Sequence, residues 1–262
     1  MQEPWSHLVA RIRSCATPKG RAVEGACSLE GTRLFERALR AGAALEAAIT
    51  TQAFLDDGDE RSQRLLSDLR GAGVELQVVP DDVLVELTEG RSIGALVGLA
   101  ELPKAPTLAS LATGSARFLA AVGIDDPGNI GALLRTAHAT GARALLTVGA
   151  CDAFHPKAVR TSMGSVFKLP VVPFMSLEHA VEELRALGIR SIGSVSSGGT
   201  DLHRLHVPPT GCAMFMGSEA FGLNESSQAR MDELVTIPMA DGVDSLSVNA
   251  AAAVLMVRLT QP

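Results

Sequence analysis

The residues that could do chemistry gather in three loops in the second half of the chain. The first is residues 125–135 (DDPGNIGALLR), where a Pro-Gly turn precedes an apolar helical pattern. We expect Asn129 to cap this helix and Arg135 to lie about two turns into it. Arg135 and His138 share a helical face through their i, i+3 spacing. An arginine in this position could grip a phosphate or a developing negative charge through its planar set of N–H donors.

The second loop is residues 215–223 (FMGSEAFGL), which continues from an apolar segment. Gly217 lets the backbone approach a ligand closely, and Gly222 permits a tight return. Glu219 stands between them with no opposite charge nearby in the sequence. Taken alone, this loop is also compatible with an ordinary turn.

The third loop is residues 237–249 (IPMADGVDSLSVN), and it leads directly into an alanine-rich segment. Ser245 is the expected N-cap of a terminal helix over residues 245–259. The small residues at 250–253 would let another element pack very closely against that helix.

Alternating strands and helices must position these loops. In the second half, strands are expected at 118–123, 144–148, 166–172, 191–195, 213–216 and 234–238, and helices at 129–140, 177–187 and 245–259. Continuous apolar strands separated by helices predict a parallel sheet covered on both faces. In open sheets of this kind, the loops that follow the strands bind ligands.

A break in the pattern falls at residues 101–107 (ELPKAPT), where two prolines predict an exposed connector. We therefore expect a first domain over 1–105 and a second over 106–262. In the first, helices are expected at 29–41, 62–72 and 81–89, and strands at 45–50, 75–79 and 94–100. This alternation predicts a small α/β sandwich.

The three loops, taken together and in order, resemble the motifs of the SpoU-type (TrmH-like) RNA ribose 2′-O-methyltransferases of the SPOUT superfamily. The motif residues in this chain are Asn129, Gly131 and Arg135, then Gly217, Glu219, Gly222 and Leu223, then Ile237, Pro238, Met239, Ser245 and Leu246. The segment Leu29-Glu-Gly-Thr-Arg33 resembles, more loosely, the substrate-binding module of this family. The resemblance thus spans nearly the whole chain.

This resemblance implies the fold, the partners and the cofactor. It implies a C-terminal α/β trefoil-knot (SPOUT) domain with a parallel sheet, preceded by a small α/β domain that binds the RNA substrate. It also implies a homodimer with its active site at the subunit interface. The RNA would be ribosomal, which the two-domain form favours, or transfer RNA. The residues implied to hold S-adenosylmethionine are Val195, Gly217, Ile237, Met239, Ser245 and Leu246.

The residues assigned to catalysis are Arg135, Glu219, Asn129 and Asn249. A protonated ribose 2′-hydroxyl is a poor nucleophile, whereas a sulfonium methyl group is already activated for displacement. Arginine stays protonated at physiological pH, so Arg135 is expected to stabilise charge and place a phosphate rather than accept a proton. Glu219 either fixes the motif loops or orients Arg135, and the proton acceptor is left open.

The third motif departs from the family pattern. SpoU-type enzymes usually have Ser-Leu-Asn-Val-Ser, whereas this chain has Ser245-Leu-Ser247-Val-Asn249. Helical positions two apart point about 200° away from each other, so the exchange matters if both side chains touch the site. Either Asn249 reaches the same polar group from a shifted frame, which we expect, or only Ser245 and the backbone matter for the cofactor.

Composition limits the alternatives. A net charge of −6 is unusual for a nucleic-acid binder, although arginines outnumber acids in the first forty residues, which allows a local basic face. The four cysteines form no Cys-x-x-Cys pair, and no metal site is expected. No apolar stretch approaches the length of a membrane span. We therefore expect a cytoplasmic protein. A dinucleotide or P-loop enzyme is disfavoured because neither glycine motif is present. A non-catalytic RNA-binding protein of the same fold is the remaining alternative.

Overall fold

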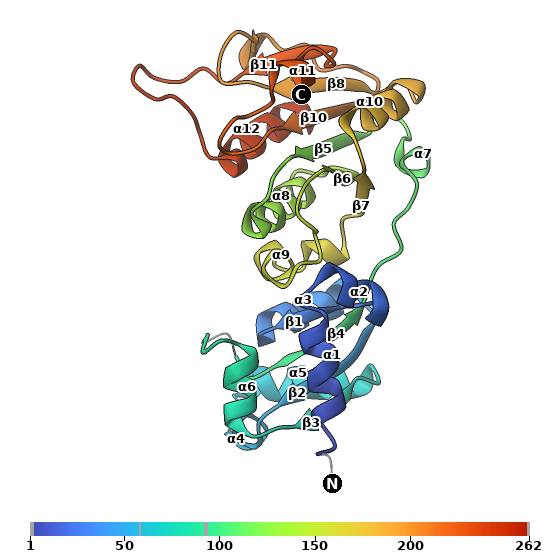
Figure 1. Cartoon of the computed structure of the whole chain (residues 1–262), viewed down its shortest axis with the longest axis vertical. Helices are drawn as coiled ribbons and strands as arrows, with labels where there is room; N and C mark the ends of the chain where they lie inside the picture. Colours follow the sequence, from blue (N-terminus) through green and yellow to red (C-terminus); the bar gives the residue numbers. More distant parts are fainter. Residues whose placement is uncertain (1–2, 58, 92–93, 261–262) are drawn as a thin grey trace. The chain divides into compact units, whose positions relative to one another are not determined.

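The structure is a computed structural model that describes residues 3–57, 59–91 and 94–260, and the chain divides into two compact units (Figure 1). The N-terminal unit comprises Met1–Lys104 and Phe154–Phe167, and the C-terminal unit comprises Ala105–Ala153 and Lys168–Pro262. The sequence placed all of 106–262 in one domain, whereas residues 154–167 belong to the N-terminal unit. The reason is apolar packing, because Ala158 and Val159 of this segment are fully buried and its helix packs on a strand of the N-terminal sheet.

In the described residues, the N-terminal unit contains a mixed four-stranded sheet in the order β1-β4-β2-β3. Strand β4 is antiparallel to β1 and β2, and β2 is parallel to β3. The strands are β1 (Ala26–Glu30), β2 (Leu45–Thr50), β3 (Glu75–Val78) and β4 (Val97–Glu101). The helices are α1 (Ser6–Ser14), α2 (Pro18–Glu24), α3 (Thr32–Ala41), α4 (Gln52–Asp57), α5 (Glu60–Gly71), α6 (Asp81–Leu87) and α9 (Pro156–Ser162), with the 3-10 helix η1 (Ser165–Phe167).

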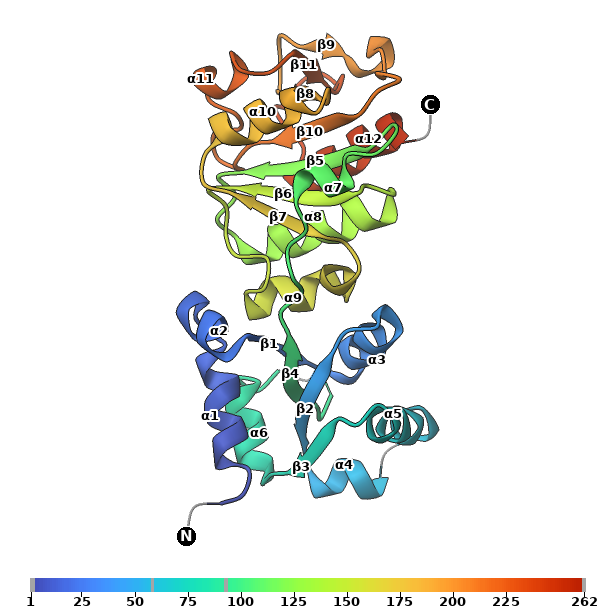
Figure 2. The same ribbon diagram turned by 90° about the vertical axis from the view of Figure 1, so that its right-hand side faces the viewer.

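Helices cover both faces of this sheet. Figure 2 shows α1 and α6 on one side and α3 and α5 on the other. Leu8, Val9 and Ile12 of α1 are buried against residues of β2 and β4. The N-terminal unit therefore has an apolar core of its own.

The beginning of this unit differs from the sequence expectation. The helix expected from residue 29 starts instead at Thr32, and the preceding residues form β1, all five of which are buried. Gly31 makes the turn between them with a φ of 93°. Sequence periodicity missed β1 because its polar residues Ser28 and Glu30 interrupt the apolar pattern of a buried strand.

The C-terminal unit contains, in the described residues, a seven-stranded sheet in the order β7-β6-β5-β10-β8-β11-β9, with every pairing parallel. The strands are β5 (Arg117–Val122), β6 (Ala144–Val148), β7 (Val171–Phe174), β8 (Arg190–Ser194), β9 (Thr200–Asp201), β10 (Cys212–Met216) and β11 (Glu233–Thr236). The helices are α7 (Leu108–Leu111), α8 (Pro127–Ala139), α10 (Leu177–Ala186), α11 (Glu225–Gln228) and α12 (Val248–Thr260), with the 3-10 helix η2 (Leu202–Arg204). The expected parallel sheet is present.

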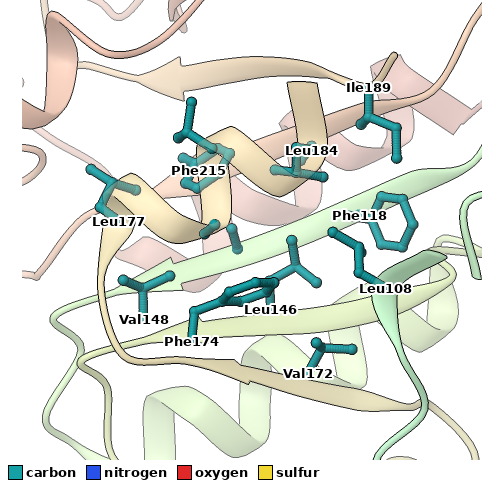
Figure 3. Packing of buried hydrophobic residues seen from close by; sticks show 14 of the residues in the cluster. Leu108, Phe118, Leu146, Val148, Val172, Phe174, Leu177, Leu184, Ile189 and Phe215 are labelled. Carbon is teal, nitrogen blue, oxygen red and sulfur yellow. The ribbon is translucent and has the colours of Figure 1, made fainter. Parts of the chain in front are cut away.

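Both faces of this sheet are covered. On one face, Leu177 and Leu184 of α10 pack over a buried apolar layer that includes Phe118, Phe174 and Phe215 (Figure 3). Burial of each such side chain is worth roughly 1.5–3 kcal/mol. On the other face, α8 and α12 pack against each other and against β5. These layers hold the strands rigidly and leave the loops at their carboxyl ends to form a site.

One expected strand begins later than predicted. Residues 166–172 were expected as a single strand, but η1 ends at Phe167 and β7 begins only at Val171. β7 is an edge strand of the sheet, which tolerates the missing N–H of Pro173 within it. Helix α9 was not anticipated, although Pro156 at its first position is a recognised signal for a helix start.

Candidate active site

A cavity lies at the carboxyl ends of β8, β10 and β11 and encloses about 640 Å³, part of it open to solvent. Parallel strands end at the same edge of a sheet, so loops distant in sequence meet there. The lining residues are Val195, Ser196, Met216, Gly217, Ser218, Glu219, Gly222, Ile237, Met239, Ser245, Leu246, Val248 and Ala251. All of the residues expected to hold the cofactor are among them.

The turn after β10 depends on two glycines. A Cβ atom at Gly217 would lie 2.0 Å from the carbonyl carbon of Gly222, so only glycine fits where the turn closes on itself. Gly222 has a φ of 62°, a region that favours glycine. Its N–H donates to the carbonyl oxygen of Ser218 at 2.8 Å. The turn is thus fixed by its backbone and places Glu219 at the cavity.

Three of the residues expected to be catalytic form a hydrogen-bonded chain. The Asn129 amide nitrogen Nδ2 donates to Glu219 Oε1, and Asn249 Nδ2 donates to Asn129 Oδ1 at 2.9 Å. Each residue comes from a different motif loop. The chain therefore links α8, the turn after β10 and the start of α12 at one side of the cavity.

The position of Asn129 differs from the expectation that it caps α8. The helix begins at Pro127, and Asp126 is the cap, with its carboxylate accepting from the Asn129 N–H at 3.1 Å. Because Asp126 satisfies the helix start, the Asn129 side chain is available to bond Glu219.

The third loop enters α12 later than expected. The helix begins at Val248, and the Ser247 hydroxyl, not that of Ser245, accepts from a first-turn N–H at 3.3 Å. Ser245 instead lines the cavity. Asn249 is half-buried in the first turn of α12, and its Oδ1 is buried with no hydrogen-bond partner among the described residues. Ser247 and Asn249, which are exchanged relative to the family pattern, therefore have different contacts. Ser247 lies at the start of α12, and Asn249 bonds Asn129.

Arg135 is the fourth residue expected to be catalytic, and it is not bonded to Asn129, Glu219 or Asn249. It is exposed on α8, outside the cavity lining, and within the described part of the chain it makes no ion pair or side-chain hydrogen bond. The described contacts of Glu219 include Asn129 and no ion pair with Arg135. The observed contact of Glu219 is therefore one that connects two motif loops.

Sequence reasoning missed some lining residues, including Ser196 and Met216. Both lie at or just after the carboxyl end of a strand, at the same edge as the expected residues. Strand ends rather than motif letters were the signal that could have found them.

The lining chemistry limits what the cavity can hold. Glu219 is the only ionisable side chain among the described lining residues, and neither lysine nor arginine is present to neutralise a phosphate. The apolar side chains of Val195, Ile237 and Leu246 suit a flat heterocycle. A nucleoside that carries a positive charge, such as S-adenosylmethionine, fits this apolar lining with its single carboxylate better than a dinucleotide with its phosphates does.

In the described ranges, no three His, Cys, Asp or Glu side chains lie where they could hold a metal ion. The helices described are all too short or too polar to cross a membrane.

Residues 116–257, more than half of the chain, match the model of the SpoU rRNA Methylase family. The chain belongs to this family. A relative in Bacillus subtilis, the 23S rRNA (guanosine(2553)-2′-O)-methyltransferase RlmP, is 29% identical over 244 residues, which are 93% of this chain and 92% of the relative. The 23S rRNA (uridine(2479)-2′-O)-methyltransferase of Streptomyces viridochromogenes is 39% identical over 137 residues, which are 49% of this chain and 47% of the relative.

Solved structures agree with this assignment. The SpoU methyltransferase AviRb of Streptomyces viridochromogenes, in complex with the cofactor AdoMet, has a TM-score of 0.83 and 25% identity, covering 96% of this chain and 97% of that one. A structure titled RNA 2′-O ribose methyltransferase has a TM-score of 0.81 and 28% identity, covering 96% and 94%. The predicted SPOUT fold class, the methyltransferase class and the cofactor are confirmed.

Proposed function

We propose that this member of the SpoU family transfers the methyl group of S-adenosylmethionine to a ribose 2′-hydroxyl of 23S ribosomal RNA in the cytoplasm. The observation that carries the proposal is the cavity itself, where the loops after β8, β10 and β11 meet beside the hydrogen-bonded residues Asn129, Glu219 and Asn249. We choose 23S RNA because relatives of this chain are named 23S rRNA methyltransferases. The relative in Bacillus subtilis matches 93% of this chain.

We assign cofactor binding to the apolar walls and the backbone of the glycine turn. Val195, Ile237, Met239 and Leu246 would enclose the adenine, and Ser245 supplies a hydroxyl beside them. When bound, S-adenosylmethionine supplies a methyl group activated by the sulfonium charge. Glu219 places a carboxylate at the same cavity, so the charges complement each other.

Arg135 would act on the RNA rather than on the cofactor. Its guanidinium has no protein acceptor in the described chain, so its donors are available to a phosphate or to the oxygen that gains negative charge in the transition state. The Asn129–Glu219–Asn249 chain would hold the loops so that the ribose and the methyl donor meet in line.

A homodimer completes this proposal. Val254 and Val257 of α12 lie three residues apart on one helical face and are 43% and 44% exposed. A second copy packed on this helix would cover them. For the N-terminal unit we propose RNA binding, supported by Arg33 of α3, which is exposed and forms no ion pair with a described residue.

The proposal is tested by mapping 2′-O-methyl groups in total RNA from host cells with and without the gene, and from cells complemented with an Arg135→Ala variant. We expect one position in 23S RNA to lose its methyl group on deletion and to recover it only with the wild-type gene. A change confined to a transfer RNA would support the transfer-RNA alternative. If no RNA changes while the purified protein still binds S-adenosylmethionine, the chain is a non-catalytic RNA-binding member of the family.

A further inference from the structure

Phe221 is an exposed aromatic side chain beside the cavity. It is 88% exposed, and all the other large apolar side chains on the described surface are aliphatic. The chain is poor in aromatic residues, with eight Phe, one Trp and no Tyr. A phenylalanine left in water forgoes roughly 1.5–3 kcal/mol of burial, so this position invites a functional explanation.

The turn that carries Phe221 is built rather than loose. The Ser218 hydroxyl accepts from the Phe221 N–H at 3.3 Å, in addition to the backbone bond that closes the turn between Ser218 and Gly222. Phe221 is two residues from Glu219, so their α-carbons lie within about 7 Å of each other. Glu219 and Gly222 line the cavity, so the exposed ring belongs to the turn that borders the proposed site of the methyl donor.

The charges of this turn indicate which part of an RNA nucleotide it can contact. Residues 217–224 contain one carboxylate and no lysine or arginine, so they are unsuited to bind a phosphate. A nucleobase presents a flat, uncharged face. Proteins that recognise RNA commonly stack unpaired bases on aromatic side chains, because single-stranded loops expose those faces.

We propose that Phe221 is a stacking platform for the base of the nucleotide whose ribose is methylated. This inference rests on the proposed function, because it needs an RNA substrate with its 2′-hydroxyl at the cavity. The base is bonded to the ribose carbon next to the one that carries the 2′-hydroxyl. Stacking on Phe221 therefore fixes the ribose beside the cavity, while Arg135 acts on the phosphate or the oxygen.

The test compares Phe221→Ala, Phe221→Leu and Phe221→Trp with the wild-type chain. The RNA is unmodified 23S RNA purified from cells that lack the gene. Filter binding gives the Kd for this RNA, and methyl transfer gives KM and kcat. Met175→Ala is the matched control, since Met175 is 95% exposed in the same unit but follows β7, an edge strand separated from β10 by β6 and β5.

Removing a stacked base contact weakens RNA binding by about 1–3 kcal/mol, which is about 5- to 150-fold. We expect the Ala and Leu variants to raise both the Kd and the KM for RNA by such a factor and the Trp variant to stay near wild type. S-adenosylmethionine affinity, measured by calorimetry, and sedimentation should not change. The control should match the wild type throughout.

Three results would overturn the inference. The first is an Ala variant with wild-type RNA affinity, and the second is a Leu variant that performs as well as Trp. The third is an Ala variant that dissociates into monomers, which would assign Phe221 to a contact between copies. RNA binding is measured independently of turnover, so a wild-type chain that binds 23S RNA without methylating it would remove the proposed function and still test the stacking.

Discussion

Most arginines of the first forty residues and Arg135 of the C-terminal unit serve different purposes. In the N-terminal unit, Arg11 bonds two glutamate carboxylates at 2.9 and 2.8 Å, Arg13 bonds a third, and buried Arg21 donates to the Cys15 carbonyl oxygen at 2.7 Å. In the C-terminal unit, Arg135 is exposed and forms no ion pair with a described residue. A local excess of basic residues in the sequence therefore overstates the surface available to RNA. Most of the basic side chains in the first forty residues bond other groups of the protein.

The clearest structural arginines surround Glu30. This carboxylate is 9% exposed and accepts from Arg91 at 3.0 Å and from Arg160 at 2.9 Å. Arg160 lies on α9, so the pair fastens a segment from the middle of the chain to β1. Arg37 adds a bond from its guanidinium to the Met163 carbonyl oxygen at 3.0 Å.

The largest effect should follow from removing the unpaired arginine. Arg135→Ala is expected to lower kcat by about 100- to 1,000-fold, because a preorganised donor to transition-state charge is lost. Its affinity for S-adenosylmethionine, measured by calorimetry, should stay within a few fold of wild type. Arg143→Ala, another exposed arginine of the same unit but outside the cavity, is the control and should remain active. Near-normal turnover by Arg135→Ala would show that this exposed arginine has no part in catalysis.

The second effect concerns stability of the N-terminal unit. Glu30→Ala leaves two partly buried guanidinium groups without their shared acceptor, and we expect the free energy of unfolding to fall by about 2–4 kcal/mol. Urea unfolding measures this change. Glu86→Ala breaks the exposed pair with Arg13 and should lower it by less than about 1 kcal/mol. Equal losses in both variants would contradict a structural role specific to Glu30.

A smaller effect separates the exchanged residues of the third motif. Asn249→Ala is expected to lower kcat about tenfold or more, because Asn129 loses the amide that positions it. Ser247→Ala removes only a helix-start acceptor, so it should lower stability by about 1 kcal/mol and leave turnover nearly unchanged. Steady-state methyl transfer on 23S RNA measures both variants. Similar, small losses in the two would show that the amide chain is not needed for turnover.

The smallest effect concerns the reactivity of buried cysteines, which is expected to be equally low in both units. Burial raises the pKa of Cys15 and of Cys212 to about 11, so at pH 8 only about one thiol in a thousand would be ionised. A disulfide reagent at pH 8 should leave both unmodified in the native protein and label half-buried Cys151 first, as read by peptide mass spectrometry. Unfolding in urea should make all the cysteines reactive. Rapid labelling of Cys212 in the native state would contradict the rigid sheet packing.

The sequence predicted the parts of the fold that depend on local pattern. The apolar strands near β5, β6, β8 and β10 and the helix α10 lie within a few residues of their expected positions. The residues expected to hold the cofactor line one cavity because the loops that carry them follow strands of the same parallel sheet.

What the sequence did not predict depends on contacts between distant residues. The Asn129–Glu219 bond joins residues 90 positions apart, and the Arg160–Glu30 pair joins residues 130 apart. Local cap preferences also gave the wrong starts for α8 and α12, since the side chains of Asp126 and Ser247 accept the first-turn N–H bonds in place of Asn129 and Ser245.

The return of residues 154–167 to the N-terminal unit has a consequence for synthesis on the ribosome. Domains usually fold as units while the chain emerges, starting from the N-terminus. Here the first unit lacks α9, and with it the Arg160 partner of Glu30, until the translating ribosome has passed the first strands of the second unit. The nascent N-terminal unit therefore stays incomplete until then. The surface that later covers Ala158 and Val159 is accessible to chaperones during this time.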